Sequence, residues 1–210
     1  MALTLHAITL ADGTRDELAG ENGAEPDSSR IAFRELSAVV SEQPSFATVE
    51  PTPEAIDNHR RIVDGAFQHG SVLPAPVGVV FRAPDVLVRW MELHYVSLTT
   101  ALEYVEDRCV ARLHVDRADG KIDDAEPESD LAARGTESVR ALRRRAVAVV
   151  PLRTDHKAAL PIGAAFLVDR DNWKDFLSAV AEQQDAHHLL RFTVTGPWAP
   201  YDFVRMVFGV

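Results

Sequence analysis

The 210-residue chain contains one cysteine, Cys109, so no disulfide can form within it. Structural disulfides belong to oxidising compartments, and their absence favours a reducing one. No uninterrupted apolar run approaches the ~20 residues that cross a bilayer, and the first residues show no basic segment followed by an apolar one. We therefore expect a cytoplasmic protein with no membrane partner.

Positive charge is also scarce. Lys and Arg number 22 against 32 Asp and Glu, which gives a formal net charge of −10 at pH 7. Because an acidic surface repels nucleic acid, no nucleic-acid partner is expected. The basic cluster Arg143-Arg144-Arg145 lies where a helix is predicted to end, and positive side chains there complement the helix dipole.

Common catalytic motifs are missing as well. The chain has no GxSxG, P-loop, GxGxxG or HExxH segment. Asp123-Asp124-Ala125-Glu126 is acidic but lacks the ligand alternation and central glycine of an EF-hand loop. His59 and His94 fall on apolar helix faces, which is typical of hydrogen-bonded core histidines. We expect no catalytic residue, no metal and no cofactor; a small-molecule-binding protein or enzyme stays as the alternative, because one fold hosts many chemistries.

The composition is that of a globular protein, with 46% hydrophobic and 26% charged residues. An N-terminal α+β domain is expected over residues 1–83. Its helix is predicted to begin at Thr52-Pro53-Glu54, where Thr52 caps the first turn and Pro53 fits within it. Apolar alternation and turn residues predict its other elements: strands over 3–11 and 71–81, a strand or a pair of short strands over 30–40, and a long loop over 12–29.

A second helix is predicted to begin near Pro84-Asp85 and to run for ~22 residues, or ~33 Å, which is long enough to join two lobes. Its predicted core-facing stripe is Leu87, Trp90, Met91, His94, Leu98, Leu102 and Val105. We therefore expect a connecting helix over 84–108. From Cys109 onward the predicted element order is β-α-β-β-α-β, the ferredoxin-like split βαβ order, with an acidic loop over 116–130. The expected fold class is α+β, with two small α/β-containing lobes joined by the long helix and a ferredoxin-like C-terminal domain over 109–195.

The last predicted strand, 189–195, is followed by Gly196-Pro197-Trp198-Ala199-Pro200-Tyr201-Asp202-Phe203-Val204. Gly196 frees the backbone, and Pro197 cannot donate to a strand ladder. The prolines stiffen a segment with three aromatic side chains, which then lose little entropy on packing. These side chains pack either on the protein or on a partner. Since exposed apolar patches are unfavourable, we expect the tail, 196–210, to dock on the protein itself.

The order of residues in 196–204 resembles the terminal signature of the gas vesicle protein F/L family, Gly-Pro-Trp-x-Pro-Tyr-x-Phe-Val. Leu73-Pro74 and Gly78-Val79-Val80-Phe81 lie where the family has Leu-Pro and Gly-Thr-Val-Phe. Between them, Pro76-Val77 replaces an Arg-Phe pair of the family. Two further segments, 36–41 and 164–169, are similar to family strands.

The resemblance implies a non-enzymatic role in the assembly or structure of gas vesicles, at the vesicle or in the cytoplasm. It implies association with the small hydrophobic shell protein (GvpA-like) and with other gas vesicle proteins. It also implies two α+β domains, of which the C-terminal one is a modified ferredoxin-like fold. The candidate structural or partner-contact residues are Leu73, Pro74, Gly78, Phe81, Gly196, Pro197, Trp198, Pro200 and Tyr201.

Overall fold

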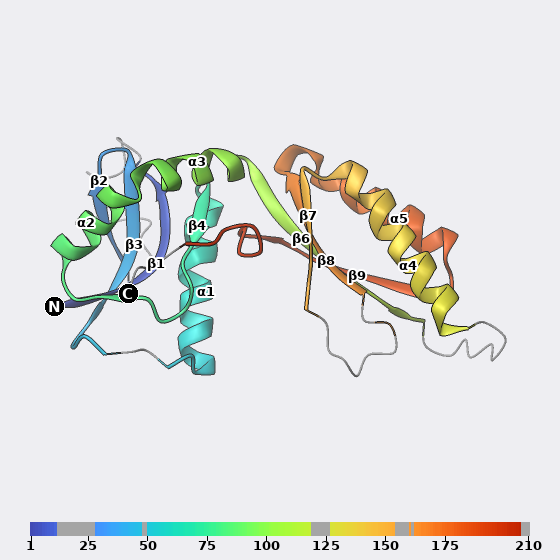
Figure 1. Ribbon diagram of the computed structural model, residues 1–210, viewed down its shortest axis with the longest axis horizontal. Helices are drawn as coiled ribbons and strands as arrows, with labels where there is room; N and C mark the ends of the chain where they lie inside the picture. The colour runs from blue at the N-terminus through green and yellow to red at the C-terminus, as the bar shows by residue number, and fades with distance from the viewer. Residues whose placement is uncertain (12–27, 48–49, 119–126, 154–159, 161, 207–210) are drawn as a thin grey trace. The chain divides into compact units, whose positions relative to one another are not determined.

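The computed structural model has a mixed α/β fold with two sheets and five α-helices in the residues that it describes (Figure 1). The chain forms two compact units: residues 108–198 make the second, and the rest make the first. The predicted loop over 12–29 falls largely outside the described residues, as does most of the acidic loop. The described ranges are 1–11, 28–47, 50–118, 127–153, 160 and 162–206.

The sheet of the first unit is antiparallel and is built around β1. Its strand order is β2-β3-β1-β4, and β5 also pairs with β1. The region 30–40 forms two strands that meet at Arg34, whose φ of 54° makes the tight turn between them. The strands are β1 (Ala2–Leu10), β2 (Ser29–Phe33), β3 (Leu36–Gln43), β4 (Val72–Pro74) and β5 (Val80–Phe81).

A β-bulge in β1 decides which side chains face which side of this sheet. The register with β3 shifts between Leu5 and Ala7, so His6 has no partner residue in the ladder. A bulge inserts one residue and reverses the alternation beyond it. As a result, Leu5 and Ile8 reach the same apolar core although they are three residues apart.

Helix α1 (Pro53–Gln68) begins as predicted. The Thr52 hydroxyl accepts a hydrogen bond from the Ala55 N–H at 3.2 Å, and Pro53 lies in the first turn. Its buried residues include His59, Ile62 and Val63. Because His59 contacts His6, which is the bulged residue of β1, α1 covers the face of the sheet on which His6 lies.

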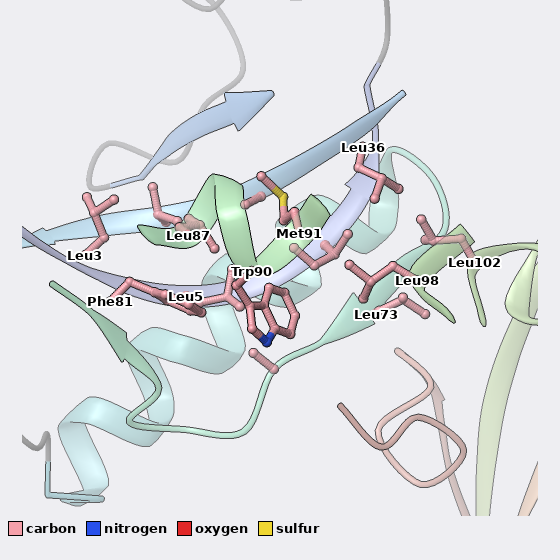
Figure 2. Packing of buried hydrophobic residues seen from close by; sticks show 14 of the residues in the cluster. Leu3, Leu5, Leu36, Leu73, Phe81, Leu87, Trp90, Met91, Leu98 and Leu102 are labelled. Carbon is pink, nitrogen blue, oxygen red and sulfur yellow. The ribbon is translucent and has the colours of Figure 1, made fainter. Parts of the chain in front are cut away.

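Helices α2 (Pro84–Leu93) and α3 (Tyr95–Val105) form a core with the sheet through Leu5, Ile8 and their neighbours. Figure 2 shows Leu87, Trp90 and Met91 of α2 meeting side chains from the strands. The described core of this unit is therefore completed by these two helices, and it includes Leu98 and Leu102 of α3.

The prediction of one continuous connecting helix is wrong. The backbone at His94 has φ −105° and ψ 9°, which separates α2 from α3. Its Nδ1–H donates to the Trp90 carbonyl at 2.8 Å, the same oxygen that its backbone N–H reaches at 3.1 Å. Apolar spacing indicated a buried stripe correctly, and that stripe packs in the core of the first sheet.

The second unit has the predicted β-α-β-β-α-β order. Its strands are all antiparallel in the order β7-β8-β6-β9, which makes β8 and β6 the two inner strands. Both helices contribute to one core with alternate residues of the strands, including Leu131 of α4 and Phe176 of α5. The elements are β6 (Arg108–Arg117), α4 (Glu128–Leu142), β7 (Ala148–Pro151), β8 (Ile162–Asp169), α5 (Trp173–Ala186) and β9 (Leu190–Trp198).

Candidate functional site

The terminal signature, residues 196–204, is divided between the two units. Gly196, Pro197 and Trp198 end β9 in the second unit, and the residues from Ala199 onward belong to the first. Both ends of the chain therefore build the first unit. The described part of the predicted tail, 196–206, therefore belongs to the two folded units.

The sequence predicted that the last strand ends at Thr195, but β9 continues to Trp198. Val110 pairs with Trp198 while Arg112 pairs with Thr195, so Gly196 and Pro197 together face one residue of β6. This irregularity is a β-bulge in an edge strand, where proline interrupts no second ladder.

Gly196 is the tightest point of this bulge. Its φ is +133°, a conformation that side chains rarely allow. A Cβ atom there would lie 2.6 Å from the Val110 carbonyl oxygen and 3.0 Å from Cη2 of Trp173. Only glycine fits without moving backbone atoms.

Trp198 is the last residue of β9, and its side chain is half-buried. Its indole N–H donates to the Thr195 hydroxyl at 3.1 Å. The Trp198 ring is therefore hydrogen-bonded across the bulge.

Residues 199–206 dock on the first unit, which agrees with the expectation for this segment. Ala199 is completely buried, and Val204 and Met206 pack against the core that α2 and α3 form. Two backbone hydrogen bonds between residues close in sequence form turns in this segment. The Tyr201 N–H donates to the Ala199 carbonyl, and the Phe203 N–H donates to the Pro200 carbonyl.

A buried histidine pair lies beside this segment. Nδ1 of His6 is 3.1 Å from Nδ1 of His59, and Nε2 of His6 is 2.9 Å from the Ser41 hydroxyl. The ring of Tyr201 lies 6.4 Å from that of His59, centroid to centroid. The interpretation of His59 as a hydrogen-bonded core histidine is confirmed, and the fold adds His6 as its partner.

Burial sets the charge state of the pair. Desolvation, and secondarily the neighbouring His59, lower the pKa of His6 to about 4. Desolvation also lowers the pKa of His59, although a hydrogen bond with the backbone of Ala75 opposes this effect. Both rings are therefore neutral near pH 7, so one Nδ1–H donates and the other Nδ1 accepts.

Acid is expected to destabilise the first unit through His6. Its pKa is near 6.5 in the unfolded chain and about 4 in the folded one. Between these values the unfolded state binds more protons, so the free energy of unfolding falls as the pH falls, by about 3 kcal/mol. Urea titrations from pH 7.5 to 4 measure this loss in the wild type and in His6→Gln. His6→Gln should lose less stability over this range, and equal losses would contradict the assignment.

The other candidate residues belong to the first unit, and most of them are buried there. Leu73 and Pro74 pair with Ile8 and Ala7 of β1. Phe81 is buried, and its ring lies 5.6 Å from that of Trp90. Gly78 has a φ of 87° in the turn before β5. These residues join Pro200 and Tyr201 in one unit, while Gly196, Pro197 and Trp198 lie in the other.

The cysteine thiol, the possible metal ligands and a surface hollow are the features of the described residues that bear on chemistry. Burial raises the pKa of the Cys109 thiol to about 11, which keeps it protonated. No group of three or more possible metal ligands occurs among these residues. A hollow on α1 is lined by charged and polar residues of one helix face, unlike the apolar walls of most ligand pockets.

One surface feature was not predicted from the sequence. Leu93 and Val96 are 74% and 73% exposed, although both belong to the helices that build the core. The sequence signal was present, since both residues are apolar and lie outside the predicted buried stripe.

Among helices in the described part of the chain, none has the length and apolar character of a membrane span.

The structure thus defines a two-unit α/β protein in which the end of the chain returns to the first unit. The family model of gas vesicle synthesis protein GvpL/GvpF matches residues 4–138 and 116–205. The chain belongs to this family.

Similar proteins agree with this assignment. Gas vesicle protein F2 of Halobacterium salinarum is 27% identical, with 85% of this chain and 81% of the relative covered. Gas vesicle protein F of a Streptomyces species is 29% identical, with 90% and 93% covered. The crystal structure of GvpF from an Anabaena species has a TM-score of 0.79 at 16% identity and covers 99% of this chain and 97% of its own. At that identity, the structural similarity shows a shared fold.

Proposed function

We propose that this protein is a non-enzymatic assembly factor or minor structural component of gas vesicles. It associates with the vesicle shell protein and with other gas vesicle proteins, at the vesicle or in the cytoplasm. Membership of the GvpL/GvpF family carries this proposal, because the family match extends over both units and includes the terminal signature.

The chemistry of the buried groups supports a structural role over the alternative, a small-molecule-binding protein or enzyme. His6, His59 and Cys109 are buried and have shifted pKa values. Catalytic groups often have such shifts, but they also need contact with a substrate. Here the two histidines bond to each other, and the cysteine thiol lies 3.6 Å from the Val168 carbonyl oxygen.

The candidate residues support the same role. Leu73, Pro74 and Phe81 build the first unit, and Gly196 shapes the edge strand from which the chain returns to that unit. We propose that they maintain the two units in a form that other vesicle proteins recognise. Direct contact with a partner by Trp198 or Tyr201 is the competing role.

Complementation tests the proposal. A host carries a gas vesicle gene cluster from which the F gene has been deleted, and receives this chain or an empty vector. We expect vesicles, seen by electron microscopy and by flotation of cells, only with the chain. A tagged copy should also retain the shell protein in a pull-down. Absence of vesicles and of shell-protein binding would overturn the proposed function.

A further inference from the structure

The outer surface of α2 and α3 presents apolar side chains to solvent. Leu93 and Val96 are the most exposed large hydrophobic residues in the described part of the chain, and Val86 and Tyr104 are 42% and 43% exposed. We call these four residues the outer stripe. Isolated exposed apolar residues are common, but several on one surface commonly mark an interaction site.

Helical geometry places these residues together. Val86 and Leu93 are seven residues apart, and Val96 follows after three more, so they lie on one side of the helices. The side that faces the core carries Leu87 and Leu98, which are buried. The separation at His94 does not change which side of the two helices is buried. Leu87 and Met91 of α2 and Leu98 and Leu102 of α3 belong to one core, so the outer stripe lies on the side of both helices that faces away from it.

Negative charge flanks the outer stripe. Arg89 is the only Lys or Arg between positions 84 and 107. All the acidic side chains of this stretch are exposed. They are Asp85, Glu92, Glu103, Glu106 and Asp107.

We propose that the outer stripe docks an amphipathic helix of a partner protein, whose apolar face is flanked by Lys and Arg. Apolar anchors at helical spacing are typical of helix recognition, and the acidic flanks complement a basic partner. A second copy of this surface would instead meet its own negative charge. The inference rests on the proposed function, since the partner would be another gas vesicle protein.

A binding experiment tests the stripe directly. The probe is a fluorescent 18-residue helical peptide of Leu and Lys, with a Leu/Glu peptide of the same pattern as its control. We expect the wild type to bind the Lys peptide at least ten-fold more tightly than the Glu peptide. Leu93→Ser/Val96→Ser should weaken binding of the Lys peptide at least ten-fold, because two apolar anchors are lost. Ile56→Ser, at a residue of α1 that is 42% exposed, is the matched control and should bind as the wild type does.

Fold and function are measured on the same variants. Because the replaced side chains are exposed, thermal unfolding should match the wild type. In the complementation host, Leu93→Ser/Val96→Ser should lose vesicles and Ile56→Ser should retain them. Equal peptide binding by the double variant and the wild type, or equal binding of the two peptides, would overturn the proposal. If the wild type itself fails to restore vesicles while the peptide results hold, the proposed function fails and the docking surface stands.

Discussion

Gly196→Ala is expected to lower the free energy of unfolding of the second unit by about 3 kcal/mol or more. At a φ of +133° an alanine is strained, and strain of this kind costs about 1–3 kcal/mol. The new Cβ would also meet the Val110 carbonyl oxygen at 2.6 Å, a backbone atom of β6 that cannot rotate away. Relief requires β9 to move from β6, which would disturb the Val110–Trp198 pairing.

Chemical denaturation measures the loss, and hydrogen exchange locates it in β6 and β9. Gly70→Ala is the matched control, because apart from Gly70 and its two chain neighbours nothing lies within 4 Å of the position a Cβ would take there. That variant should change stability by less than about 1 kcal/mol. Equal stability of the two variants would show that the bulge relaxes without loss and would remove the structural reason for Gly196.

A chain that ends at Trp198 is expected to lose about 4 kcal/mol or more from the first unit. The removed residues include Ala199, which is completely buried, and Val204 and Met206, which pack on the core of α2 and α3. Exposing that core returns apolar surface to water at roughly 25 cal/mol per Å². The loss is a large share of the ~5–15 kcal/mol that holds a typical domain folded.

Hydrogen exchange again separates the units. The backbone amides of β1 and β3 should exchange faster in the truncated chain, while those of the inner strand β8 of the second unit stay protected from exchange. Arg205→Ala, at an exposed position of the same segment, is the control and should stay within about 0.5 kcal/mol of the wild type. If the truncated chain keeps first-unit protection but no longer retains the shell protein, the segment is a partner-binding surface.

Local sequence determined most of the secondary structure. Thr52 and Pro53 defined the start of α1 through contacts within one turn. Alternation of apolar residues located the strands of the second unit and their order along the chain, since period-two spacing arises from strand geometry itself. The residue order of 196–204 was specific enough to indicate the family, which the family model confirms.

Tertiary structure decided what those elements pack against. The stripe of α2 and α3 had the same spacing whether it faced a second lobe or the first sheet, because periodicity reports a face and not its partner. Pairing of His6 with His59 joins residues 53 positions apart, through a bulge that no local pattern revealed. The return of residues 199–206 to the first unit likewise depends on contacts between distant segments of the chain, which residue types and their spacing do not encode.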